Sequence, residues 1–298
     1  MENEIINRSF GTHDGSFHAD EVTACALLLL YNLIDKDKIY RTRDMDLLNR
    51  CQYVCDVGGI YDPKIKRFDH HQKEYTGELS SAGMVLNYLK NQGMMEVSLY
   101  EHLNNTLVRY IDAHDIGKSE GKNYSFSHVI ANFLPIDYNA SIKEKNESFF
   151  QAVDFTYLHL KRMEERFYYS RKCMDRVKKA MESKDKYLIF DESIPWIESF
   201  FELGGESHPA LFVVMPSQSH WKLRGIPPDS ANRMKVRLPL PFEWAGLHAD
   251  DLKKVSNIEG AIFCHKGRFI SIWKTKEDAM KALKYVLKKA GVEHGNNI

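Results

Sequence analysis

The most informative segment of the chain reads Gly11-Thr12-His13-Asp14-Gly15-Ser16-Phe17-His18-Ala19-Asp20-Glu21. It follows residues 5–12, which have the pattern of a strand, and it leads into residues 20–33, which have the pattern of a helix. Asp20 and Glu21 stand at the start of that helix, where the positive end of the helix dipole favours carboxylates. A strand, a polar loop and a helix in this order predict an α/β unit.

The same alternation continues through the first half of the chain. Residues 39–42 and 53–57 are strand-like, and residues 80–91 and 99–114 are helix-like. Strands that alternate with helices favour a parallel sheet, because each helix carries the chain back across the sheet. We therefore expect a mostly parallel sheet in the N-terminal half.

A long helix is predicted between the two halves of the chain. Residues 147–184 lack glycine and proline and repeat apolar side chains at helical spacing. Three strand-like segments and a final helix follow, at residues 186–190, 210–215, 260–264 and 276–290. The expected fold is α/β, with an N-terminal domain over residues 1–185 that includes the linker helix and a smaller α/β domain over residues 186–298.

Composition favours a soluble globular protein, with 298 residues, 43% hydrophobic residues and a formal net charge of zero. Such a chain has no overall field that would attract a membrane or a nucleic acid. The N-terminal segment lacks the apolar core of a signal peptide, and the longest apolar run, residues 24–31, is too short to span a bilayer. Five scattered cysteines do not suggest a disulfide framework. We expect a cytoplasmic protein without a membrane partner, and leave a homo-oligomer open.

Four segments concentrate histidine and aspartate, at residues 11–21, 55–59, 68–72 and 110–115. Each lies at the end of a predicted strand or on a helix, and parallel α/β sheets bind ligands outside the carboxyl ends of their strands. Two metal ions about 3.5–4 Å apart need bridging carboxylates and further ligands such as imidazole. Any one segment alone is more often a turn, a helix cap or a core histidine. Together they predict two divalent ions, and the mixed oxygen and nitrogen ligands favour manganese over magnesium.

The triplet Asp69-His70-His71 resembles the signature that names the DHH phosphoesterase superfamily. A closer similarity is to the MYG family, a related group described as metal-dependent hydrolases and as 3′-to-5′ exonucleases on RNA. The family hallmark GTHxGxFHxDE is present at residues 11–21, and similar segments occur at residues 41–44, 56–59 and 262–265. The resemblance spans nearly the whole chain and implies a DHH-like catalytic domain.

The resemblance also implies the residues of the site. It gives six metal ligands in two groups that share one carboxylate: His13, His18 and Asp56 for one ion, and Asp20, Asp56, His70 and Asp112 for the other. It places His71 beside the attacked phosphate and makes Asp69 the residue that orients the histidines. The wider superfamily usually has aspartate at the position of His18, which puts the metal's identity in question. Asp115 remains an alternative to Asp112.

The C-terminal domain is expected to bind the rest of the substrate. It carries 16 Lys/Arg against 13 Asp/Glu, which suits a phosphate-binding surface. Residues 260–268 resemble the glycine-rich element that grips the substrate in DHH relatives. The candidate substrate-binding residues are His265, Lys266, Arg268, Arg224 and Arg237.

The leading hypothesis is a two-metal phosphoesterase that acts as a 3′-to-5′ exonuclease or oligoribonuclease on single-stranded RNA or short oligonucleotides. A small-molecule phosphatase or nucleotide phosphodiesterase is the first alternative. A non-catalytic metal-binding regulatory protein is the second. The sequence contains neither a nucleophilic-serine motif nor a Walker-type loop, so covalent serine chemistry and nucleotide-driven motor chemistry have no support.

Overall fold

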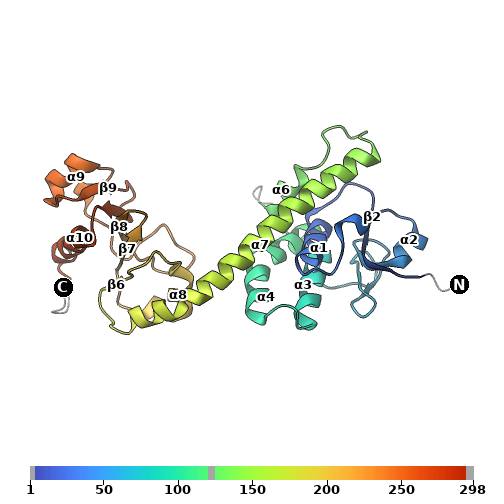
Figure 1. Cartoon of the computed structure of the whole chain (residues 1–298), viewed down its shortest axis with the longest axis horizontal. Coiled ribbons are helices and arrows are strands. Elements are labelled where there is room, and N and C mark those ends of the chain that lie inside the picture. Colours follow the sequence, from blue (N-terminus) through green and yellow to red (C-terminus); the bar gives the residue numbers. More distant parts are fainter. Residues whose placement is uncertain (1–3, 120–124, 293–298) are drawn as a thin grey trace. The chain divides into compact units, whose positions relative to one another are not determined.

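The chain forms two compact units. The computed structural model describes residues 4–119 and 125–292, and the units comprise residues 1–167 and 168–298. Each unit has its own five-stranded sheet, and the division falls inside helix α7, Ile142–Met181 (Figure 1). The predicted α/β class and the predicted long helix are confirmed. The boundary expected near Asp185 lies just beyond the end of that same helix.

The first sheet has the strand order β2-β1-β3-β5-β4. Its strands are β1 (Ile6–Thr12), β2 (Ile39–Arg41), β3 (Cys51–Cys55), β4 (Tyr61–Asp62) and β5 (Arg67–Phe68). All neighbouring pairs are parallel except β4 with β5, so the predicted mostly parallel sheet is confirmed. The carboxyl ends of β1, β3 and β5 consequently lie along one edge of the sheet.

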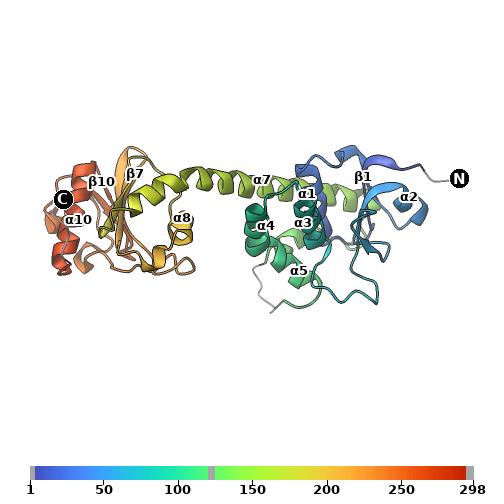
Figure 2. The same ribbon diagram turned by 90° about the horizontal axis from the view of Figure 1, so that it is seen from below.

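Helices cover this sheet. They are α1 (Ala19–Leu30), α2 (Met45–Arg50), α3 (Ser81–Asn91), α4 (Val97–Leu103), α5 (Arg109–Asp115) and α6 (Phe126–Ala131), with a short 3₁₀ turn at Lys36–Lys38. Residues 19–28 of α1 are all buried, including the carboxylates Asp20 and Glu21 in its first turn. α1 packs against α3, and the two lie side by side in Figures 1 and 2.

The helix predicted over residues 99–114 is interrupted. α4 and α5 are joined by a π-helical turn, Asn104–Val108. A π turn inserts one residue into the helical repeat, so the side chains that follow it are rotated relative to those before it. This rotation affects which residues of α5 face α1 and α3, against which α5 packs.

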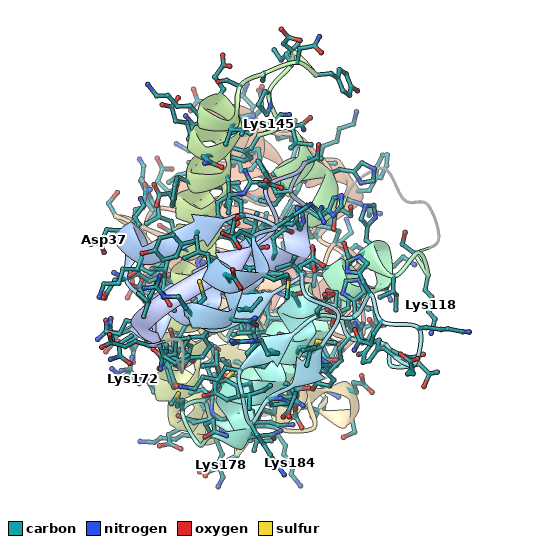
Figure 3. The ribbon with its side chains drawn as sticks, turned by 90° about the vertical axis from the view of Figure 1, so that its right-hand side faces the viewer. Asp37, Lys118, Lys145, Lys172, Lys178 and Lys184 are labelled. Carbon is teal, nitrogen blue, oxygen red and sulfur yellow. The ribbon has the colours of Figure 1, made fainter. Side chains whose placement is uncertain are left out.

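Helix α7 begins with a capping box. The Ser141 hydroxyl accepts the Glu144 backbone N–H at 3.2 Å, and the Glu144 carboxylate accepts the Ser141 backbone N–H at 2.8 Å. Phe149, Val153 and Leu160 on the first part of the helix are buried. The start of α7 is thereby fixed, and with it the end of the loop that precedes the helix. Lys145, on the first turn, is labelled in the view of Figure 3.

The second unit has the strand order β6-β7-β8-β10-β9. Its elements are β6 (Tyr187–Ile189), α8 (Ile197–Glu202), 3₁₀ turns at Gly205–Ser207 and Phe242–Trp244, β7 (Phe212–Ser217), β8 (His220–Gly225), α9 (Ala249–Ser256), β9 (Ala261–Cys264), β10 (Ile270–Trp273) and α10 (Lys276–Lys289). Among the described strands of this unit, β6 and β7 alone pair in parallel. Trp244 and Trp273 are fully buried in its core. Among the described residues of both units, none of the helices combines the length and the apolar character needed to cross a bilayer.

Candidate metal centre

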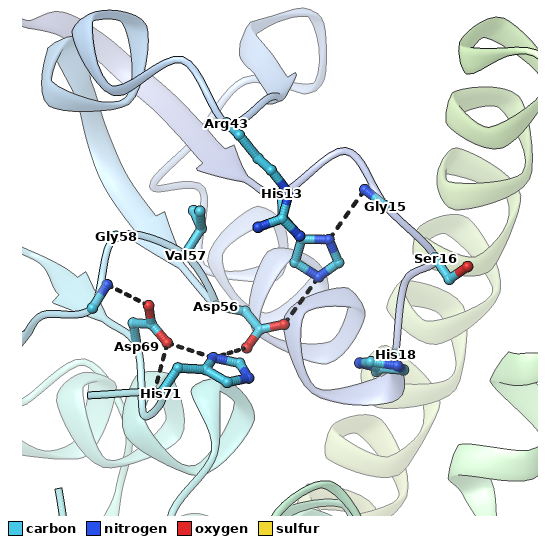
Figure 4. A pocket seen from close by; sticks show the side chains of 11 residues that line it. His13, Gly15, Ser16, His18, Arg43, Asp56, Val57, Gly58, Asp69 and His71 are labelled. Atoms are coloured by element: carbon cyan, nitrogen blue, oxygen red, sulfur yellow. Dashed lines mark hydrogen bonds and ion pairs between the residues drawn. The ribbon is translucent and has the colours of Figure 1, made fainter. Parts of the chain in front are cut away.

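Three strand ends deliver the first groups of the site. His13 follows β1, Asp56 follows β3, and the Asp69-His70-His71 triplet follows β5. Because these three strands are adjacent and parallel, residues far apart in sequence meet at one edge of the sheet. His13, Asp56, Asp69 and His71 line a cavity of about 560 Å³, which we call the metal pocket (Figure 4).

Asp56 is the residue that the groups share. Three clusters of potential ligand atoms, each within 4.8 Å, occur among the described residues: His13, His18, Glu21 and Asp56; Asp56, Asp69, His70 and His71; and Asp20, Asp56, His70 and Asp115. Asp56 has a φ of 57°, in the left-handed region that aspartate tolerates better than most residues. One carboxylate common to all three clusters is suited to bridging two cations.

Several polar atoms of these clusters have no hydrogen-bond partner. The buried atoms Asp20 Oδ1, Asp56 Oδ1 and His70 Nδ1 make no hydrogen bond within the described chain. A buried acceptor without a partner costs about 1–3 kcal/mol, and such atoms need an explanation. Divalent cations would supply the missing partners, so the donor set fits a metal centre.

The pKa shifts of the buried groups at the site also favour cation binding. Burial, followed by repulsion from Asp56 and Glu21, raises the pKa of Asp20 well above its usual value. Burial and nearby carboxylates also raise the pKa of Asp56, although a hydrogen bond with His13 opposes them. For His13, burial lowers the pKa, but hydrogen bonds to Asp56 and Glu21 outweigh it and raise it to about 9. Carboxylates crowded in this way bind cations favourably.

Asp69 positions His71. Its Oδ1 atom accepts the His71 backbone N–H at 3.0 Å and lies 2.8 Å from His71 Nδ1, and its Oδ2 atom accepts the Gly59 backbone N–H at 2.6 Å. Burial alone would raise the pKa of Asp69, but these hydrogen bonds lower it. Asp69 therefore stays charged and fixes the ring of His71 at the metal pocket, the arrangement drawn in Figure 4.

Asp115, rather than Asp112, lies among the potential ligands. Asp115 Oδ2 is 3.0 Å from His70 Nε2, and a hydrogen bond from His70 lowers the pKa of Asp115 in spite of its burial. Asp112 Oδ1 instead accepts the Ser80 N–H, the Ser80 hydroxyl and the Gly83 N–H at 3.1, 2.7 and 3.0 Å. Asp112 thus caps the start of α3. A side chain at position 83 would collide with Asp112, which explains the glycine there.

The model of the MYG1 exonuclease family, described as an uncharacterised protein family (UPF0160), matches residues 9–287. The chain belongs to the MYG1 family. This membership confirms the resemblance carried by residues 11–21, and with it the prediction of an enzyme in an exonuclease family.

Relatives of the MYG1 family are similar to this chain over nearly its whole length. The MYG1 protein of Chlamydia muridarum (strain MoPn / Nigg) is 52% identical over 96% of this chain and 99% of its own length. The human MYG1 exonuclease is 31% identical over 93% of this chain and 85% of its own length. A crystal structure of RecJ with Mn²⁺ from Thermus thermophilus aligns with 95% of this chain at 11% identity and a TM-score of 0.30. The chain spans about half of that RecJ (52%), and so distant a similarity carries no argument about the site.

The candidate substrate-binding residues of the second unit differ in their surroundings. His265, Lys266 and Arg268 form the turn between β9 and β10, and Arg224 lies on β8 opposite Ile270. Arg237 differs, because its guanidinium donates to the carbonyls of five residues: Gly205, Glu206, His208, Ala210 and Pro227. Five N–H donors are all that an arginine has. The structure therefore gives Arg237 a bracing role, and we leave it out of the substrate contacts proposed below.

The sequence pattern did not single out two residues of the site. Glu21 was expected only at a helix start, yet its Oε1 atom lies 3.2 Å from His13 Nε2. Arg43 belongs to the segment at residues 41–44, which was noted for its similarity to the family but given no role. It is the one arginine or lysine among the described residues that line the metal pocket.

Proposed function

We propose that this protein is a metal-dependent exonuclease that degrades single-stranded RNA, including short oligoribonucleotides, from the 3′ end. The observation that carries the proposal is Asp56, one buried carboxylate shared by three clusters of potential ligands at the edge of an α/β sheet. The name of the human relative, MYG1 exonuclease, supports the reaction class.

The proposed ligands are those that the structure brings together. They are His13, His18 and Asp56 for one ion, with Glu21 nearby, and Asp20, Asp56, His70 and Asp115 for the other. Manganese suits this mixture of imidazoles and carboxylates. Bound divalent ions would lower the pKa of a water nucleophile and offset charge on the phosphoryl oxygens.

His71 is the proposed partner of the attacked phosphate. With its Nδ1 atom held by Asp69 at 2.8 Å, the ring presents its Nε2 atom to other groups, and the side chain is 61% exposed. When it is protonated at both nitrogens, a histidine placed in this way donates a hydrogen bond to a phosphoryl oxygen or a proton to the leaving oxygen. Asp69 acts through His71 and is a positioning residue.

Arg43 is the proposed phosphate anchor of the first unit. Its side chain is 67% exposed and pairs with Asp14 at 3.4 Å, and Figure 4 shows it reaching toward His13. The groups around it are carboxylates and imidazoles. A guanidinium keeps its charge at any working pH and binds phosphate oxygens in pairs. Arg43 is therefore suited to binding a phosphate of the RNA substrate beside the metal centre.

Arg43→Ala is expected to raise KM for single-stranded RNA about tenfold, the loss of one charge-assisted hydrogen bond. It should also reduce the slope of log affinity against log salt by about 0.7, because one phosphate contact is lost. Arg162→Ala is the matched control, since Arg162 is 69% exposed and also pairs with one carboxylate, Glu165. Equal salt slopes in wild type and Arg43→Ala would rule out the anchor.

The proposed activity is tested with 5′-labelled single-stranded RNA, manganese and purified protein. A ladder of progressively shorter labelled products, absent in Asp56→Asn, is the expected result for digestion from the 3′ end. Immediate release of a labelled mononucleotide would show digestion from the 5′ end instead. Turnover of only pyrophosphate or mononucleotides would favour the small-molecule phosphatase. Manganese binding without any turnover would favour a non-catalytic metal-binding regulatory protein.

The proposed location is the cytoplasm. All five cysteines are free and buried, as a reducing compartment favours. Fractionation of cells that express a tagged chain would test this.

A further inference from the structure

A second cavity adjoins the metal pocket. It has a volume of about 300 Å³ and shares Ser16 with the metal pocket; we call it the side pocket. Its other walls are residues 131, 132 and 134–138, where α6 ends and a loop begins, and Lys145 on α7. In Figure 4, Ser16 lies on the opposite side of the metal pocket from Asp69 and His71. The side pocket therefore opens on the side of the site away from the proposed phosphate partner.

The lining of the side pocket suits a flat, neutral group. Ile136 and Tyr138 are 99% and 96% exposed, so both present apolar surface that the described chain does not cover. Asn132 and Ser16 offer hydrogen-bonding groups. The charges of Lys145 and Asp137 offset each other, which does not favour a second phosphate. A nucleobase has the required aromatic faces and polar edge, and bases stack on exposed tyrosines.

The two pockets are held in a fixed relation by Arg41. Its guanidinium donates to the Gly15 carbonyl and, at 3.0 Å, to the Asn146 side chain on α7. It also lies 4.8 Å from the ring centre of Phe149 on that helix. Arg41 thus ties the loop that carries Ser16 to the helix that carries Lys145. An RNA strand whose phosphate lies at the metal centre would therefore meet the side pocket at a constant distance from that phosphate.

We infer that the side pocket binds the base of a nucleotide next to the phosphodiester held in the metal pocket. This inference rests on the proposed function and names its substrate class: single-stranded oligonucleotides, in preference to small phosphate esters, which leave the side pocket empty. An interface between two copies of the chain is the competing occupant, but a cavity of about 300 Å³ with one cation and one anion is small and polar for that purpose.

The test compares two substrates and three variants. The substrates are a tetraribonucleotide and bis(p-nitrophenyl) phosphate, a small diester that lacks bases, both with manganese. The ratio of kcat/KM for the tetranucleotide to kcat/KM for the small diester is expected to fall about tenfold in Tyr138→Ala, the loss of one base–aromatic stack. Tyr138→Phe keeps the ring and should retain the ratio. Tyr169→Ala, which removes another exposed tyrosine, is the matched control.

A binding measurement separates this inference from the proposed function. Tetranucleotides with 2-aminopurine at each internal position in turn are titrated with wild type and Tyr138→Ala in the presence of calcium. Stacking in the side pocket predicts fluorescence quenching at one position in the wild type and its loss in Tyr138→Ala, whether or not the wild type cleaves RNA. An unchanged ratio with no quenching would overturn the inference. A wild-type dimer that Tyr138→Ala converts to a monomer, with an unchanged ratio, would assign the surface to a second copy instead.

Discussion

Replacing Asp56 with asparagine is expected to reduce RNA cleavage by at least about a thousandfold. The substitution keeps the size of the side chain but removes the charge that three ligand clusters share. It should also abolish the stabilisation of the protein by manganese. At a metal concentration of about 100 Kd, one ion stabilises by about 2.7 kcal/mol, which corresponds to a rise in Tm of about 5–10 °C for a domain of this size. Activity assays and thermal denaturation with and without manganese measure both effects.

The metal-free Asp56→Asn protein should unfold near the wild-type temperature. Asp56 is crowded by Glu21 and Asp115, which together with burial raise its pKa, so neutralising it relieves repulsion while the bond with His13 is weakened. Asp62→Asn, the same chemical change on the half-buried edge strand β4, is the control and should retain both activity and the manganese effect. If Asp56→Asn still gained the full rise in Tm with manganese, a bridging role for Asp56 would be untenable.

The positions of most candidate ligands were predictable because the rule that places them is local. His13 and Asp56 each follow an apolar strand that the pattern predicts, and the carboxyl ends of parallel strands share one edge of the sheet. His70 follows the two-residue strand β5, which the pattern does not predict. The strand and helix patterns were clear in the N-terminal half, so the fold and this edge could be predicted together. No long-range contact had to be known in advance.

Other features depend on contacts between residues that are distant in sequence. The five carbonyls that hold Arg237 come from two separate segments, and the sequence pattern gives no sign of them. Strands β8 and β10 were not predicted, because their apolar side chains alternate over only a few residues. The side pocket is built by an irregular loop, residues 132–141, whose conformation has no sequence period.

The choice between Asp112 and Asp115 as the ligand also depends on contacts that the sequence pattern does not show. The two residues are three positions apart and lie on neighbouring faces of α5, so helical spacing does not separate them. The π turn just before α5 shifts the phase of the helix by one residue. Only the structure shows that Asp115 reaches His70 while Asp112 reaches Ser80 and Gly83.

This difference gives opposite phenotypes for two similar substitutions. Asp115→Asn is expected to lose one of two bound manganese ions and at least about a hundredfold of the activity, because a charged ligand is removed from the cluster with Asp20 and His70. Asp112→Asn should keep both ions, since its amide oxygen can still accept the hydrogen bonds at the start of α3. Asp112→Ala should instead lower the free energy of unfolding by about 2–3 kcal/mol.

Metal content and urea denaturation of the purified variants distinguish the two roles. Manganese per chain is measured by elemental analysis after gel filtration, and unfolding is followed by circular dichroism in EDTA so that metal binding does not contribute. A stoichiometry of two for Asp112→Asn and one for Asp115→Asn would establish Asp115 as the ligand. If Asp112→Asn lost an ion while Asp115→Asn kept both, Asp112 would be the ligand, and its three hydrogen bonds to Ser80 and Gly83 would serve to orient it toward the metal.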